Sequence, residues 1–336
     1  MAKTLSIYLV MLIVLPLFFR VASAGSVNDL YTVTVRVADR TEPVKAQAVA
    51  TALGIVLTKL SGQRDSSFKL ASQQGNSAKS VQSLRYLSNG VLEVVFDRVA
   101  INSLLVQSGM PIWDRLRPVV LVVSPAANKF KPEMRVLLEF IAKDRGLPIV
   151  WTTTDTSDQF PEADLGKTQA LAARYQADAV LLARIPTLTS ASSEGISTFR
   201  WQLVMEGASQ ETKGTVEEGL NFAADQLGRY YAASSKQTAN QILKVSGIKS
   251  VEDYATVVKR LGELIILNQL SVQALSSDEL QLQLRTYGSS ISLRRLLSLD
   301  NVFVEESMSD SEADGVFRYR YSPVDVVSNS PINLTQ

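Results

Sequence analysis

The sequence contains neither cysteine nor histidine. Without thiolate or imidazole ligands, an ordinary structural zinc site is excluded. A thiol nucleophile, a Ser-His-Asp triad and a haem bound through histidine are excluded for the same reason. Without disulfides the fold must be stabilised by its core, and a hydrophobic content of 46% over 336 residues allows this.

The chain also lacks an excess of charge of either sign, because it has 34 Lys and Arg residues and 33 Asp and Glu residues. A protein that binds nucleic acid usually carries a basic field, so we expect no nucleic-acid partner. No residue set has the spacing of a known active site, cofactor site or metal site. We therefore assign no catalytic, cofactor-binding or metal-ligating residue, and we expect no cofactor.

Residues 1–24 have the pattern of a secretory signal. Lys3 precedes an apolar stretch over 5–19, and Ala22-Ser23-Ala24 matches the small-x-small pattern of a signal-peptidase site. We expect cleavage after Ala24 and a periplasmic or secreted mature protein. The alternative is an uncleaved inner-membrane anchor, but the apolar stretch is shorter than the ~20 residues that span a bilayer and contains Pro16. No transmembrane segment is expected after cleavage.

Three apolar runs, over 119–123, 147–151 and 177–185, organise the middle of the chain. They lack the alternation of a half-exposed strand, which predicts parallel strands covered by helices on both faces. The alternating segment 198–205 follows and predicts an antiparallel strand at the sheet edge. We expect a mixed-sheet α/β middle module over 116–236.

The preceding residues, 25–115, predict an α+β module of order β-α-β-β-α. A period-two strand over 31–37 is followed by a helical apolar pattern that ends at Gly62. Asn89-Gly90 is a strong hairpin signal, because both residues tolerate the positive φ of a type I′ turn. Asp97 then caps a second helix.

Residues 237–306 predict the order β-α-β-β-α-β, the ferredoxin-like split unit. The tail, 307–336, is acidic and polar, with one strand candidate over 317–321. We expect this strand to pair within the same module on grounds of proximity. The predicted fold class is therefore α/β and α+β, with three small modules.

Several short segments, taken together, resemble the uncharacterised bacterial family catalogued as domain of unknown function 2066. The segments are 30–39, Phe96-Asp97, Met110-Pro111-Ile112-Trp113, 117–122, 175–181, and Val245-Ser246-Gly247 with Asp253-Tyr254. The resemblance implies a Gram-negative envelope protein and supplies no catalytic residues. The middle module is also similar to the amino-terminal domains of Tol-type translocation and lipoprotein-activator proteins, which bind other envelope proteins.

Two motif-like patterns are better explained by chance. Gly166-Lys167-Thr168 matches the end of a phosphate-binding loop, but Pro161 stands where that loop requires glycine. Ser66 with Lys69, and Ser246 with Lys249, have the Ser-x-x-Lys spacing but neither pair opens a convincing helix or has companion elements.

Two further groups have both a functional and a structural interpretation. Asp155, Asp158, Glu162 and Asp164 could bind calcium or supply paired carboxylates, but their spacing matches no calcium loop and a solvated loop is favoured. The three tryptophans could line a sugar-binding groove, but their positions favour core packing. They are Trp113, Trp151 and Trp201.

The leading functional hypothesis is a non-catalytic, soluble cell-envelope protein that acts through contacts with other envelope proteins. An extended partner could add a strand at the predicted edge, 198–205. The alternatives are a carboxylate-dependent periplasmic hydrolase and a receptor for a small ligand. No pattern specifies an oligomeric state.

Overall fold

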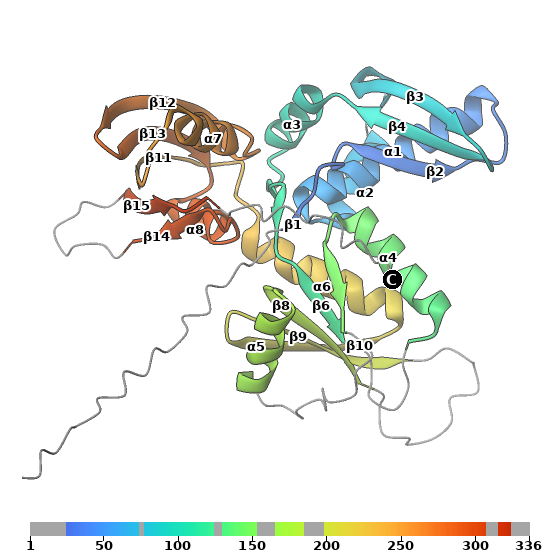
Figure 1. The fold of residues 1–336 in the computed structure, drawn as a ribbon. Coiled ribbons are helices and arrows are strands. Elements are labelled where there is room, and N and C mark those ends of the chain that lie inside the picture. The colour runs from blue at the N-terminus through green and yellow to red at the C-terminus, as the bar shows by residue number, and fades with distance from the viewer. Residues whose placement is uncertain are drawn as a thin grey trace, which may run out of the picture.

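The computed structural model describes residues 25–73, 77–123, 130–152, 165–184, 198–306 and 315–323 (Figure 1). Its strands form one three-stranded sheet, two five-stranded sheets and one two-stranded pair, with helices packed on them. This confirms the predicted combination of α/β and α+β modules. The predicted signal segment, 1–24, lies outside the described residues.

The N-terminal sheet has the antiparallel order β2-β4-β3. Its strands are β2 (Thr32–Arg36), β3 (Val81–Leu87) and β4 (Val91–Phe96). The predicted hairpin is confirmed, since Asn89 and Gly90 have φ of 63° and 67°. The helices are α1 (Glu42–Ser61), α2 (Arg64–Gln73) and α3 (Arg98–Gln107), with a 3-10 turn at Ser77–Ser80.

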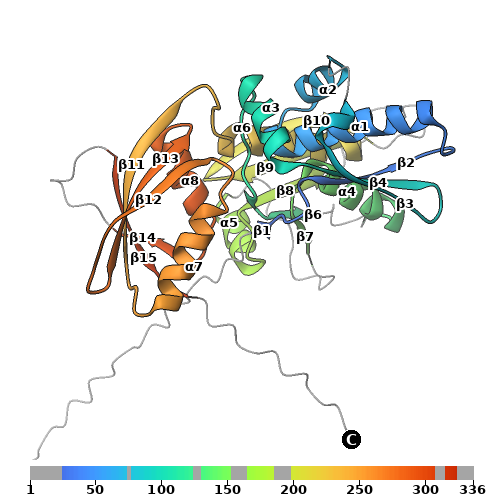
Figure 2. The same ribbon diagram turned by 90° about the horizontal axis from the view of Figure 1, so that it is seen from above.

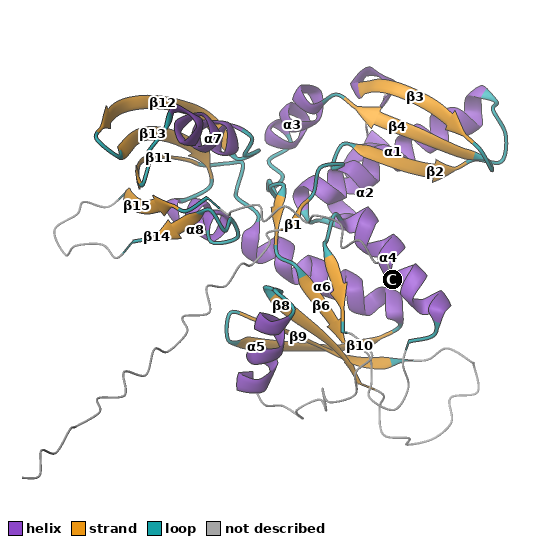
Figure 3. Cartoon of the chain, viewed as in Figure 1, coloured by secondary structure: helices purple, strands orange, loops and turns teal. Residues whose placement is uncertain are grey.

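Helix α1 covers one face of this sheet (Figure 3). It begins with Pro43 in its first turn and ends at Gly62, whose φ of 72° is left-handed. Among the described helices, α1 alone has the length and hydropathy of a membrane span, yet 61% of that window is buried inside the protein. It is therefore the core helix of the N-terminal sheet.

The middle sheet has the order β10-β9-β8-β6-β7. As predicted, β6 (Val120–Val123), β7 (Ile149–Trp151) and β8 (Ala179–Arg184) are parallel. Helices α4 (Pro132–Arg145) and α6 (Val216–Tyr231) pack on one face, and α5 (Leu165–Arg174) packs on the other. This coverage on both faces explains the continuous apolar runs.

The prediction that 198–205 forms the sheet edge is wrong. Strand β9 (Phe199–Met205) pairs with a further strand, β10 (Ala208–Gly214), which is the actual edge. The two strands are joined at Glu206 and Gly207, whose φ values of 49° and 74° make a tight turn. Strand β10 is polar and mostly exposed, so it carries no apolar alternation that would have revealed it.

The C-terminal sheet has the order β12-β13-β11-β15-β14 and lies at the opposite end of the molecule from the N-terminal sheet (Figure 2). The predicted β-α-β-β-α-β order is confirmed by six elements. They are β11 (Thr238–Ser246), α7 (Val251–Gly262), β12 (Leu267–Ser276), β13 (Glu279–Tyr287), α8 (Ser290–Leu297) and β14 (Phe303–Glu305).

The tail adds one strand to this sheet. Strand β15 (Val316–Tyr321) lies between β11 and β14, parallel to the first and antiparallel to the second. The predicted pairing of 317–321 within this module is therefore confirmed. Phe317, Tyr319 and Tyr321 are buried, whereas β14 buries only Phe303, so the aromatic strand takes the inner position.

Candidate functional site

Four charged side chains are buried where the three large sheets meet, each at most 3% exposed. They are Lys59, Asp114, Arg117 and Arg145. Strongly buried ionisable groups often mark functional sites, so their partners decide how they are interpreted.

Asp114 accepts two backbone hydrogen bonds. Its Oδ2 accepts from the N–H of Ile266 at 3.0 Å and its Oδ1 from the N–H of Arg115 at 2.7 Å. Burial raises the pKa of the Asp114 carboxyl, and these two N–H groups oppose that rise. The carboxylate is thus a tie between this segment and the C-terminal sheet.

Arg117 ties the same segment to the N-terminal module. Its guanidinium carbon lies 3.8 Å from the ring centroid of Trp113, and its Nη2 donates to the carbonyl oxygens of Lys59 at 2.7 Å and Trp113 at 2.9 Å. Burial lowers the pKa of Arg117, and the charge of Asp114 opposes this. Asp114 and Arg117 thus each bond to the backbone of another module, and both connect parts of the fold.

The sequence candidates are not brought together by the fold. Asp155, Asp158, Glu162 and Asp164 lie outside the described residues. Gly166-Lys167-Thr168 forms the first turn of α5, with Thr168 buried. The first Ser-x-x-Lys pair, Ser66 and Lys69, lies in a helix, α2, contrary to the expectation that it opens none. Both side chains are exposed.

The second pair, Ser246 and Lys249, lies at the end of β11 and beyond it, and the hydroxyl of Ser246 donates to Glu306 Oε1 at 3.2 Å. The tryptophans pack in the core as expected, since Trp113 and Trp201 are 0% exposed. Trp151 is partly buried against the same core. None of these groups forms a binding surface.

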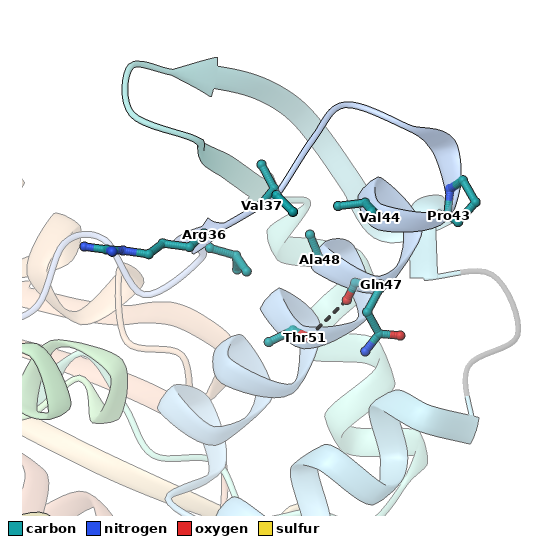
Figure 4. Close-up of a pocket in the computed structure, with 9 residues that line it drawn as sticks. Arg36, Val37, Pro43, Val44, Gln47, Ala48 and Thr51 are labelled. Atoms are coloured by element: carbon teal, nitrogen blue, oxygen red, sulfur yellow. Dashed lines mark hydrogen bonds between the residues drawn. The ribbon is translucent and has the colours of Figure 1, made fainter.

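A cavity of about 340 Å³ lies between the end of β2 and the first turns of α1 (Figure 4). The strand side is lined by Val35, Arg36, Val37 and Ala38, and the helix side by Pro43, Val44, Gln47, Ala48 and Thr51. The helical lining residues fall mainly at spacings of three and four, which places them on one face. We call this cavity the β2–α1 cleft.

The β2–α1 cleft has an apolar centre. Figure 4 shows Val37, Val44 and Ala48 facing one another, while the charged end of Arg36 extends away from them. Within the described residues no carboxylate pairs with Arg36, and the lining contains no carboxylate. The cleft therefore offers apolar contact and one cation at its rim, but no pair of groups for acid/base catalysis.

Strand β2 is an edge of its sheet, and part of its backbone is unpaired. Phe96 N donates to Tyr31 O at 3.0 Å and Val37 N to Gly90 O at 2.8 Å, so odd-numbered residues of β2 face β4. By alternation, the N–H and C=O groups of Thr34 and Arg36 point to the open side.

The groups of Thr32 on that side are already satisfied. Its N–H donates to Asp29 O at 3.1 Å, and its carbonyl accepts from Lys59 Nζ at 3.0 Å. Among the described residues, the open part of the edge therefore runs from Thr34 to Arg36, and it overlaps the lining of the cleft, which begins at Val35.

Sequence reasoning identified both elements of the cleft but not the cleft itself. The alternating segment 31–37 carried the same edge-strand signal as 198–205, and that signal could have placed the open edge here. The separation of α1 from the end of β2 is a tertiary feature, and no local pattern encodes it.

A family model described as a domain of unknown function (DUF8605) matches residues 24–114, the segment that contains the cleft. This is a different family from domain of unknown function 2066, so the resemblance drawn from the sequence is wrong. The short segments behind that resemblance contain no chemical motif and were insufficient to separate the two. No curated protein matches the chain.

Solved structures give only weak likenesses. A competence-damaged protein (CinA) superfamily protein from Escherichia coli is 11% identical with a TM-score of 0.20, over 39% of this chain and 83% of that chain. Its counterpart from Klebsiella pneumoniae is 14% identical with a TM-score of 0.22, over 39% and 92%. Allophanate hydrolase from Kluyveromyces lactis is 8% identical with a TM-score of 0.19, over 69% and 62%. Scores this low carry no argument about function.

Proposed function

We propose that this is an exported, non-catalytic protein of the cell envelope that binds an extended segment of a partner protein in the β2–α1 cleft. The observation that supports this proposal is the open strand edge at Thr34 and Arg36, which lies beside an apolar cavity of about 340 Å³. An added strand would satisfy the free backbone groups of the edge, and side chains at alternate positions would determine specificity.

The chemistry of the cleft selects the partner segment. Successive side chains of a strand point to opposite faces, so every second side chain of the partner would face the cleft. Val37, Val44 and Ala48 favour an apolar side chain there. Arg36 at the rim favours an acidic residue next to it.

Thr34→Pro tests strand addition directly. Because the N–H of Thr34 points to the open side, proline removes a donor that a partner would use and leaves the β2–β4 ladder intact. A peptide selected from a random library on the mature chain should bind Thr34→Pro at least tenfold more weakly. Thr34→Val keeps the N–H and should bind the peptide as the parent does.

Val44→Glu tests the cleft, since it places a charge among apolar side chains. Ala46→Glu, at an exposed position of α1 outside the lining, is its matched control. Bound peptide should also protect the amides of Thr34 and Arg36 from hydrogen exchange. Selected peptides that bind all four variants equally and protect neither amide would refute the proposal. Loss with Val44→Glu alone would favour a small-ligand receptor.

Export is proposed from Lys3, the apolar stretch over 5–19 and Ala22-Ser23-Ala24. Mass spectrometry of the native protein should find a mature chain that starts at Gly25. An intact Met1 terminus would instead support the anchored alternative.

A further inference from the structure

Three cationic side chains form a row across the middle sheet. Arg184 of β8 is opposite Arg200 of β9, and Arg200 is opposite Lys213 of β10. Residues directly opposite each other in antiparallel strands share a face. Arg184, Arg200 and Lys213, the cationic row, therefore lie side by side on three neighbouring strands.

The row lies on the face that α5 covers only in part. Leu182 lies two residues before Arg184 on β8, and Val204 lies four residues after Arg200 on β9, so both share the face of the row. Both belong to the small apolar cluster under α5. Arg200 and Lys213 are exposed and Arg184 is half-buried. The row also lies at the edge where β8 ends, and open α/β sheets commonly bind ligands outside the carboxyl ends of their parallel strands.

Like charges directly opposite each other destabilise a sheet, and the row contains two such pairs in succession. Within the described residues no carboxylate forms an ion pair with any of the three. Glu211 lies in the next row, opposite Gln202, but it pairs with none of them. Among the residues that the structure describes, the repulsion within the row is therefore uncompensated.

A hydrogen-bond chain holds the innermost cation in place. Arg184 Nη2 donates to Gln202 Oε1 at 2.9 Å, and Gln202 Nε2 donates to Ser209 Oγ at 2.7 Å. Gln202 is 9% exposed, so it provides a buried support. Since a guanidinium has five N–H donors, most of those on Arg184 remain available.

We propose that the cationic row binds a phosphate-bearing ligand. Strands lie about 4.8 Å apart, so the row spans about 10 Å at the backbone, and its long side chains can converge on one compact anion. A phosphate group offers two or more charges and several acceptor oxygens, which suit two guanidinium groups and one ammonium better than a single carboxylate does.

The site is separate from the β2–α1 cleft, so it does not depend on the proposed peptide binding. A phosphate could come from a soluble molecule or from a lipid headgroup. Pyrophosphate, measured by calorimetry, represents the first source. Vesicles of phosphatidylglycerol, compared with phosphatidylcholine in a sedimentation assay, represent the second.

Arg200→Gln with Lys213→Gln is the informative double variant, because both side chains are exposed. The mature chain should bind pyrophosphate, and the double variant should bind it at least tenfold more weakly. Lys69→Gln, which removes one exposed positive charge on α2, is the control for loss of charge elsewhere on the surface and should bind as the parent does. Additional binding to phosphatidylglycerol vesicles would identify the lipid source, and binding of pyrophosphate alone the soluble one.

The free protein gives an independent readout. Removing one member of a repulsive row should raise the melting temperature of Arg200→Gln by roughly 1–2 °C without ligand. The proposal is overturned if neither pyrophosphate nor phosphatidylglycerol vesicles bind the parent, or if the double variant binds them as the parent does. A lower melting temperature for Arg200→Gln would also overturn it, because Arg200 would then be paired in the free protein.

Discussion

Asp114 Oδ2 accepts a hydrogen bond of 3.0 Å from the backbone N–H of Ile266, which lies 152 residues further along the chain. One residue before Asp114, the N–H of Trp113 donates to Leu60 O at 2.7 Å. A single short segment is therefore bonded to the N-terminal helix on one side and to the C-terminal module on the other. The buried charges of the junction serve this connection.

The contact between Gly219 of α6 and Trp201 of β9 leaves no room for a methyl group. A Cβ at Gly219 would overlap the indole of Trp201, which is 0% exposed and donates from Nε1 to Thr215 O at 3.0 Å. Alanine gains about 1 kcal/mol of helix propensity over glycine, but overpacking costs about 1–3 kcal/mol. We expect Gly219→Ala to lower the free energy of unfolding in urea.

Gly262 at the end of α7 provides the control. Nothing lies within 4 Å of a Cβ placed there, so Gly262→Ala should leave the free energy of unfolding unchanged or raise it slightly. Equal effects at Gly219 and Gly262 would contradict the packing described for α6.

Lys59 predicts a pH dependence of stability. Burial lowers the pKa of this ammonium below 10.5, and the charges of Asp29 and Asp144 only partly oppose the change. As pH rises through the folded pKa, the folded protein releases a proton that the unfolded chain retains up to 10.5. The unfolded state then binds more protons, so the free energy of unfolding rises with pH in that window.

In Lys59→Met this rise should disappear, because methionine fills similar space without a charge. The measurement is urea unfolding of the parent and of Lys59→Met from neutral pH to 10.5. The result is the difference between their free energies of unfolding at each pH. Lys69→Met, at an exposed position, should leave the profile of the parent unchanged. A profile in Lys59→Met that matches the parent would mean that Lys59 does not titrate in this range.

Chelation is expected to have no effect on folding. The chain supplies neither thiolate nor imidazole, and the described residues contain no cluster of acidic groups that could hold a metal ion. The melting temperature should therefore be the same with and without EDTA. A fall of several degrees would indicate a calcium site that involves Asp155, Asp158, Glu162 or Asp164.

Local signals account for the parts of the fold that were predicted correctly. Gly62 and Asn89-Gly90 take the positive φ values that their sequence positions suggested. The apolar runs of β6 and β8 are buried on both faces. Each of these features depends on residues close together in the chain, where propensity and periodicity act directly.

The features that were missed depend on register between distant segments. Strand β10 is recognised only by its pairing with β9, because its own side chains are polar and exposed. The cationic row requires the register of β8, β9 and β10 together, and the β2–α1 cleft requires the path of a helix relative to a strand edge. Single-segment patterns contain none of this information.

The place of β15 in the C-terminal sheet sets an order of events during biosynthesis. Until residues 316–321 have been made, β11 lacks its parallel neighbour and β14 has no strand beside it. The trio β12-β13-β11 can form earlier, because its members are joined by antiparallel pairs. A chain interrupted before Val316 would thus present two unfinished strand edges, so completion of this sheet distinguishes a full-length chain from a truncated one.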